Sequence, residues 1–216
     1  MTGGLSIWDR DQRGDAAKAA VEYAEHGWWV VPGATWTGSQ YVVPGTNRVL
    51  TGPLPYVPRD RATSDVRTVR RWWTHDLKQS PAVLLRAGEV FNLVLISESL
   101  ARYVIATALF RSQPGPVLFR PDTRRAGFVV EPGLIFGSTF PRENFSAPSG
   151  EVMAMSPGDV IVAPPSLVPN GRVEWWINPR KVEWSPCELS VLMDSIILAC
   201  RQRRDMSSNA NRNVRG

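Results

Sequence analysis

The chain has 216 residues, of which 43% are hydrophobic, so its size fits one domain, or one domain with a small satellite, around a real core. It contains no run of eighteen apolar residues and no apolar segment behind a positively charged start, which argues against a membrane span and a secretory leader and predicts a cytoplasmic protein. The formal net charge is +5, but residues 201–216 carry five arginines against one aspartate, hence +4, so the remainder is too close to neutral to predict a basic groove for nucleic acid.

The first predicted elements are a helix and a strand joined by a glycine. We expect residues 1–14 to form a flexible N-terminus. The alanine-rich segment that follows favours a helix that ends at Gly27, and the apolar residues 28–31 continue directly as a strand. Residues 34–60 are rich in glycine, proline and polar residues and predict a long loop, with short strands around residues 41–43.

The next predicted element is an amphipathic helix with a basic face. Thr63, Ser64 or Asp65 can cap its N-terminus. Four apolar residues fall on one helical stripe, namely Val66, Val69, Trp72 and Trp73. The opposite face carries Arg67, Arg70 and Arg71. Two interpretations of these arginines stay open: the solvated face of an ordinary packed helix, or a nucleic-acid-binding face that follows phosphates.

Strands interleaved with helices follow in the middle of the chain. Two buried strands are predicted at residues 81–88 and 91–96, and a helix at residues 100–110. Further short strands are predicted at residues 116–119, 126–130, 158–166 and 172–178, the last after a Pro-Asn-Gly turn. Together these elements favour an α+β fold or a mixed α/β sheet.

The last predicted helix runs from Ser185 to Cys200. Ser185, Pro186 and Glu188 have the residue types of an N-cap, a first-turn proline and a capping-box partner. Apolar residues then recur at three- and four-residue steps. Cys187 and Cys200 lie too far apart for a metal-binding CxxC pair and have no histidine nearby, so we predict buried, reduced thiols on this helix.

Residues 201–216 are predicted to form a disordered basic tail after an ordered domain at residues 15–200. The tail is rich in serine, asparagine and arginine and has too few apolar residues to bury surface. It is interpreted either as a solvated end or as a weak phosphate-binding arm.

Four stretches have the residue types and the order of a known family. They are AAVEYAEHGWWVVPG, ATSDVRTVRRWW, FNLVLISES and GDVIVAPPSLVPNGRVEWWIN, and together they span roughly residues 16–190. The first looks like an opening helix and Gly-Trp strand, and the second like an Ala-Thr-x-Asp segment before a tryptophan pair. The third sits where a metal-binding strand belongs, and the fourth looks like an Ala-Pro-Pro-Ser turn and its following strand. In these features the chain resembles the bifunctional DNA primase/polymerase N-terminal (Prim-Pol) domain of the archaeo-eukaryotic primase superfamily.

The resemblance implies a two-part α+β fold in which an RRM-like mixed sheet, packed by helices, carries the active site. In active members an Asp-x-Asp pair at a strand end and a later acidic residue hold divalent cations, and a histidine contacts the phosphates of the incoming nucleotide. Cations are required because phosphoryl transfer must neutralise the triphosphate and activate the attacking 3′-hydroxyl, and Mg²⁺ prefers anionic oxygen ligands.

Other residue types occupy the positions that match these metal ligands. Ser97 and Ser99 fall where the two aspartates belong, and Glu98 is expected to point away from them because alternate strand residues face opposite ways. The third acidic position falls near Met153, with Glu151 two residues away. Hydroxyls are poor ligands for a cation that resists dehydration, so we predict no catalytic residue, no metal site and no cofactor.

The strand that matches the nucleotide-contacting strand of the family contains no histidine. His26 and His75 lie elsewhere and are interpreted as surface or capping residues. Arg124 and Arg125 leave open a phosphate-binding site that works without metal, because arginine can bind phosphate through two hydrogen bonds. In the alternative interpretation both are solvated turn residues, or Asp122 pairs with one of them.

Three hypotheses for the function follow. The first is a catalytically degenerate Prim-Pol-like domain that acts as a binding or regulatory module for a nucleotide, a nucleic acid or a protein partner. The second is an active primase or polymerase whose carboxylates, with Mg²⁺ or Mn²⁺, come from Glu89, Glu98 and Glu151 or from a partner chain. The third is a protein-interaction domain with no role in nucleic-acid chemistry, in which some of the nine tryptophans form an exposed patch. No membrane partner is expected.

Overall fold

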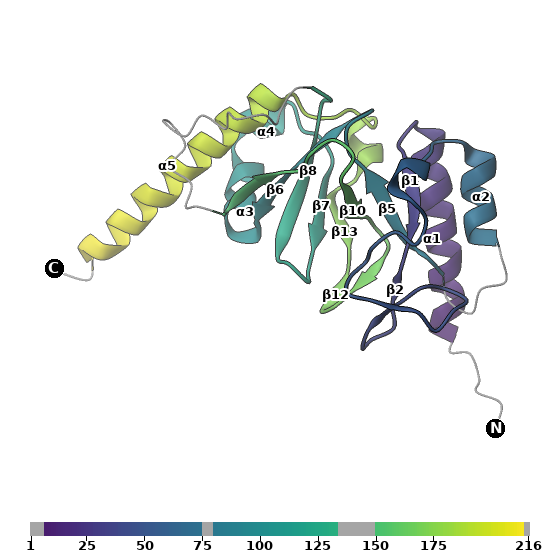
Figure 1. Ribbon diagram of the computed structural model, residues 1–216. Coiled ribbons are helices and arrows are strands. Elements are labelled where there is room, and N and C mark those ends of the chain that lie inside the picture. The colour runs from purple at the N-terminus through teal and green to yellow at the C-terminus, as the bar shows by residue number, and fades with distance from the viewer. Residues whose placement is uncertain (1–6, 75–79, 134–149, 214–216) are drawn as a thin grey trace. The chain divides into compact units, whose positions relative to one another are not determined.

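The computed structural model of the protein describes residues 7–74, 80–133 and 150–213, without the side chains of residues 7–14, 74 and 207–213. Its helices and strands are drawn in Figure 1. The chain divides into two compact units. The first unit comprises residues 1–90, 120–123 and 156–175, and the second unit comprises residues 91–119, 124–155 and 176–216. The family resemblance likewise implies a fold in two parts.

The first unit is built on a three-stranded antiparallel sheet. Strand β5 (Ala82–Arg86) lies in its centre, between β1 (Val30–Gly33) and β10 (Val160–Val162). Helix α1 (Ile7–Glu25) precedes β1, and Gly27 follows the helix with a φ of +78°, as its position in the sequence predicts. The helix begins at Ile7, within the segment for which we expect a flexible N-terminus.

Helix α2 (Val66–Thr74) has the cap and the two faces that its sequence predicts. Asp65 is the cap, because its Oδ2 accepts hydrogen bonds from the backbone N (2.9 Å) and the hydroxyl (2.6 Å) of Thr68. On the apolar stripe Val69 and Trp73 are buried. The arginines of the opposite face are all exposed, namely Arg67, Arg70 and Arg71.

Short strands and turns add to the first unit. A small antiparallel sheet lies within the loop predicted for residues 34–60 and consists of β2 (Thr35–Trp36), β3 (Tyr41–Val42) and β4 (Val49–Leu50). Other short elements are the 3-10 helix η1 (Arg59–Arg61) and the strand pair β11 (Leu167–Val168) and β12 (Gly171–Arg172). Between β11 and β12 the predicted Pro-Asn-Gly turn is present, with φ of +68° at Asn170 and +147° at Gly171.

The second unit is built on a sheet with the strand order β13-β7-β8-β6-β9. Its strands are β6 (Asn92–Ser97), β7 (Val117–Arg120), β8 (Arg125–Val130), β9 (Val152–Ala154) and β13 (Glu174–Ile177). Among β6 to β9 the first and third strands lie in the middle and a helix follows the first, which is the arrangement of an RRM-like sheet. The α+β fold is therefore confirmed, and the two ladders of β6, with β8 and with β9, are antiparallel.

Three helices of the second unit share a core with this sheet. They are α3 (Glu98–Ala106), α4 (Ala108–Ser112) and α5 (Leu189–Asn213). Val94 and Ile96 of β6 lie in one buried cluster with Leu192 and Ile196 of α5. The single helix predicted at residues 100–110 is interrupted at Thr107, because its hydroxyl accepts a hydrogen bond from the backbone N of Phe110 (3.2 Å) and caps α4.

Helix α5 begins later than its sequence predicts. The backbone of Cys187 forms a parallel bridge beside Val130: its N donates to the carbonyl of Val129 (3.0 Å), and its carbonyl accepts from the N of Glu131 (3.1 Å). This extended backbone excludes a helical turn at Ser185, so the prediction of an N-cap there was wrong. Cys187 therefore lies before the helix, whereas Cys200 lies on it. Both cysteines are free and buried, as predicted.

Helix α5 also continues further than its sequence predicts. We expect its end at Cys200 and a disordered tail from residue 201, whereas the helix runs to Asn213 (Figure 1). The continuation carries Arg203, which is partly buried between exposed neighbours. The 3-10 helix η2 (Pro179–Val182) precedes α5 in the chain.

Two findings concern the surface of the described residues. No helix among them is both long and apolar enough to cross a membrane. Eight of the nine tryptophans have described side chains, and each of the eight is buried or partly buried. None of these eight tryptophans is therefore fully exposed to solvent.

Candidate functional site

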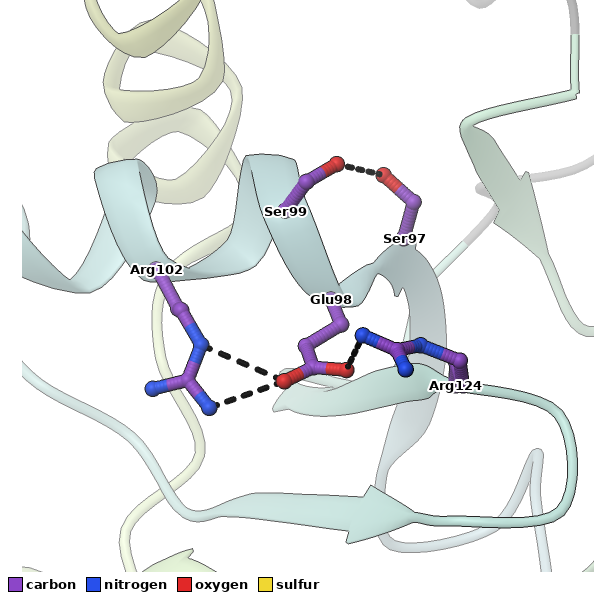
Figure 2. Close-up of polar contacts among 5 residues, drawn as sticks. All are labelled: Ser97, Glu98, Ser99, Arg102 and Arg124. Carbon is purple, nitrogen blue, oxygen red and sulfur yellow. Dashed lines mark hydrogen bonds and ion pairs between the residues drawn. The ribbon is translucent and has the colours of Figure 1, made fainter.

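The junction between β6 and α3 carries the two serines that match the aspartate positions of the family. Ser97 is the last residue of β6, and Glu98 and Ser99 already lie in the first turn of α3. The Oγ atoms of Ser97 and Ser99 are 3.4 Å apart, and Figure 2 marks the contact between them. Glu98 points away from the serines, as predicted, but the cause is the turn into the helix rather than strand alternation.

Glu98 is held by two arginines (Figure 2). Arg102, one helical turn further on, donates to its Oε1 from Nη2 (2.8 Å) and Nε (3.3 Å), and Nη2 of Arg124 lies 2.9 Å from its Oε2. The hydrogen bond from Arg102, with the positive charges of Arg124 and Arg102, holds the pKa of Glu98 below its usual value. Both oxygens of this carboxylate are thus engaged.

Glu151 lies beside Ser97 and is held by a third arginine. The hydroxyl of Ser97 donates to Oε1 of Glu151 (3.2 Å), and the backbone N of Ser97 donates to the carbonyl of Glu151 (2.8 Å). From α5, Arg203 donates to Oε1 through Nη1 (2.9 Å) and to Oε2 through Nη2 (2.7 Å). This two-pronged bond is the main reason that the pKa of Glu151 is lowered and that of Arg203 raised.

The sequence predicts the third acidic position of the family near Met153, and in the structure the neighbouring carboxylate of Glu151 lies beside Ser97. Met153 lies opposite Leu95 in the β6–β9 ladder, and 48% of its surface is exposed. Glu151 precedes β9 and is the carboxylate that contacts Ser97. An offset of two residues separates the predicted position from the carboxylate that reaches the strand end.

Arg125 is the residue of β8 directly opposite Ser97. Its Nη2 donates to the carbonyl of Gly150 (2.6 Å), and its Nη1 is buried without a hydrogen-bond partner among the described residues. Arg124, by contrast, is 78% exposed and paired with Glu98. Asp122 binds Arg120 (2.7 Å) and neither of these two arginines, so that part of the alternative interpretation was wrong.

Other residues considered for the site belong to the first unit or lie outside the described residues. His26 is exposed next to the end of α1, and its Nδ1 is 2.9 Å from the carbonyl of Glu22, as a capping role predicts. His75 lies outside the described residues. Glu89, in the first unit, pairs with Arg86 (3.2 Å).

The side chains at this junction do not fit a site for Mg²⁺. We use the name β6 edge for the residues gathered at the C-terminal end of the interior strand β6. They are Ser97, Glu98, Ser99, Arg102, Arg124, Arg125, Glu151 and Arg203. Its two carboxylates both accept from guanidinium groups, and the aspartate positions supply neutral hydroxyls, whereas Mg²⁺ requires free anionic oxygens. Within residues 7–74, 80–133 and 150–213, no three histidine, cysteine or acidic side chains form a group that could hold a metal ion.

The balance of charge at the β6 edge is positive. Four arginines against two glutamates leave a net charge of +2 on these eight residues. A surface of this sign repels divalent cations and attracts phosphate groups. Chemically, this set of paired carboxylates, hydroxyls and guanidinium groups suits an anion better than a divalent cation.

Two residues of the β6 edge were missed by sequence reasoning. Arg102 could have been found, because it lies four residues after Glu98 on a predicted helix and can pair with it. Arg203 gave no such signal, since it lies in a segment whose composition predicts disorder.

Of three comparisons with known proteins, one gives a match. The family model described as bifunctional DNA primase/polymerase, N-terminal (Prim-Pol), matches residues 20–189. Searches of curated proteins and of solved structures gave no match. The matched range contains both serines and Glu151, and it ends where α5 begins. On this match, which covers most of the chain, the protein belongs to the Prim-Pol family of DNA primase/polymerase domains.

Proposed function

We propose that this protein is a catalytically degenerate Prim-Pol domain that binds the phosphate groups of a nucleotide or nucleic acid without a divalent cation, as a binding or regulatory module. Family membership supplies the expectation of nucleic-acid or nucleotide interaction. The chemistry of the β6 edge supplies the expectation that this interaction does not lead to polymerisation.

One observation carries the proposal: arginines hold both carboxylates of the β6 edge, and hydroxyls stand where the family has aspartates. Polymerisation requires cations that neutralise the triphosphate and activate the 3′-hydroxyl. With a net charge of +2 and no free carboxylate, the β6 edge attracts the triphosphate itself but not the cation.

Arg125 is the residue best placed to bind the phosphate. Arg125 lies opposite Ser97 on the neighbouring strand. Its side chain is therefore attached to the backbone at the strand end where the family carries its active site. Its Nη1 has no hydrogen-bond partner among the described residues, and an unmade hydrogen bond of this kind costs free energy. A guanidinium group can bind two phosphate oxygens at once.

A pair of assays tests this function. Equilibrium dialysis with dATP in EDTA should show binding to the wild-type chain, at least a tenfold loss in Arg125→Gln, and no change in Arg111→Gln. Arg111 is an exposed arginine of the same unit and serves as the matched control. Primer extension with Mg²⁺ or Mn²⁺ should give no product.

Two results would contradict the proposal. Incorporation of dNTPs by the purified chain that depends on Mg²⁺ or Mn²⁺ would favour the active polymerase with displaced carboxylates. Equal dATP affinity of the wild type and Arg125→Gln would show that the phosphate site does not lie at the β6 edge.

A further inference from the structure

We infer that Arg203 is a built-in cation: its guanidinium group, delivered by α5, takes the place of the divalent metal at the strand end and keeps metal ions out. This inference deepens the proposed function, on which it rests for the identity of the strand end. It concerns Arg203, which lies beyond the residues that match the family model.

The guanidinium group of Arg203 is bound much as a small cationic ligand would be. Two of its nitrogens bind the two oxygens of Glu151 at 2.9 and 2.7 Å, and one of these oxygens also accepts from Ser97. The side chains of Arg203 and Glu151 are only 26% and 19% exposed. The planar fork of arginine matches a carboxylate in this way, whereas a lysine would supply only a point charge.

The core face of α5 fixes the direction in which Arg203 points. Ile196, Ala199 and Cys200 are buried in the core of the second unit, and Arg203 lies seven, four and three residues after them. Residues at these spacings share one face of a helix. The side chain of Arg203 is therefore carried to the sheet by the same packing that holds α5, while its neighbour Arg204 is exposed.

The charges are consistent with a substitution of one cation by another. Where the family has carboxylates at three positions around a divalent cation, this strand end keeps one carboxylate, Glu151, and two hydroxyls, Ser97 and Ser99. One guanidinium charge neutralises that single carboxylate. A divalent ion at the same place would face a positive charge already seated and would have to displace it.

The test restores the carboxylates and measures metal binding to the full chain without nucleotide. Mn²⁺ is titrated into three variants: Ser97→Asp with Ser99→Asp, the same pair with Arg203→Gln, and the same pair with Arg204→Gln. Aspartate is compatible with both positions, an N-cap and the first turn of a helix. Arg204→Gln removes the same charge from the same helix and controls for the general electrostatic effect.

We expect the variant with Arg203→Gln to bind Mn²⁺ at least tenfold more tightly than the other two, as measured by electron paramagnetic resonance of free Mn²⁺. Equal affinity of all three variants, an equal gain from Arg204→Gln, or no Mn²⁺ binding by the Arg203→Gln variant would overturn the inference. Because no nucleotide is present, these outcomes are independent of whether the protein binds phosphate.

A second measurement serves if the restored variants do not fold. In the otherwise wild-type chain, hydrogen exchange of the amides of residues 201–206 should become at least threefold faster in Arg203→Gln and in Glu151→Gln, and stay unchanged in Arg204→Gln. Exchange that is the same in all three variants would overturn the inference, because Arg203 would then not be seated on Glu151.

Discussion

At the scale of single residues, arginine pairing decides the state of the carboxylates at the β6 edge. Glu98 and Glu151 both have lowered pKa values, in each case first because an arginine donates hydrogen bonds to the carboxylate. The serines at the aspartate positions could be predicted from the sequence, because the family motif fixes their place along the chain, whereas the predicted third acidic position fell two residues from Glu151. The partner Arg203 could not, because no local pattern connects residues so far apart in sequence.

The pairing of Glu151 predicts a dependence of stability on pH. Because its pKa is lower in the folded chain than the value of about 4.3 expected when unfolded, the ionised pair stabilises the fold above that pH and loses its effect as the pH falls through the folded-state pKa. We expect Glu151→Gln to lower the free energy of unfolding by about 1–2 kcal/mol at pH 7 and by much less at pH 3. Urea unfolding at both pH values measures this, and a loss of the same size at both would contradict it.

The two thiols should be unreactive in the folded protein. Burial is the main cause that raises the pKa of Cys187 to about 12, and burial also raises the pKa of Cys200. Since the thiolate is the reactive form, a disulfide reagent at pH 8 should label neither cysteine in the native chain and both in urea. Rapid labelling of the native chain would mean that these thiols are accessible.

At the scale of elements, periodicity predicted most helices and strands but misplaced two boundaries of the last helix. The strand β6, the cap of α2 and the turn at Gly27 follow from local residue patterns. The start of α5 does not, because Cys187 forms backbone hydrogen bonds with Val129 and Glu131, far away in sequence. The extension of α5 past Cys200 could not be predicted either, because composition does not indicate the contact between Arg203 and Glu151.

The bridge at Cys187 predicts that Gly115 cannot be replaced. A Cβ at this position would lie 2.5 Å from the N of Cys187 and 2.9 Å from the carbonyl O of Val129, which are backbone atoms that cannot give way cheaply. We expect Gly115→Ala to lower the free energy of unfolding by about 2–3 kcal/mol.

The matched control for Gly115 is Gly52→Ala, because a Cβ at Gly52 would meet no atom within 4 Å. Thermal unfolding of both variants gives the comparison. Equal melting temperatures would mean that Cys187 does not pass this closely beside Gly115.

At the scale of the whole molecule, the chain is a Prim-Pol domain in two compact units, and each unit carries exposed or partly exposed arginines. In the first unit they include the arginines on the exposed face of α2, where Arg70 also pairs with Glu25 (3.5 Å). In the second unit they include the arginines of the β6 edge. The family and the fold class could be predicted from the sequence, whereas the sign of the charge at the strand end emerged only from tertiary contacts.

The basic face of α2 predicts a contribution to nucleic-acid binding that salt weakens. If Arg67, Arg70 and Arg71 contact phosphates, replacing all three by Gln should reduce the slope of log affinity against log salt by about 2–3, because each phosphate contact contributes about one. Filter binding of single- and double-stranded DNA across a salt series measures the slope. If the slope is unchanged in the triple variant, these three arginines do not contact phosphates and belong to a solvated face.

Calorimetric titration of the wild-type chain with dATP, in EDTA and again in excess Mg²⁺, tests most directly the claim that the β6 edge binds phosphate without metal. We predict dissociation constants that agree within about twofold, because the arginines rather than a cation neutralise the phosphates. Affinity at least tenfold higher with Mg²⁺, or detectable only with it, would contradict this account.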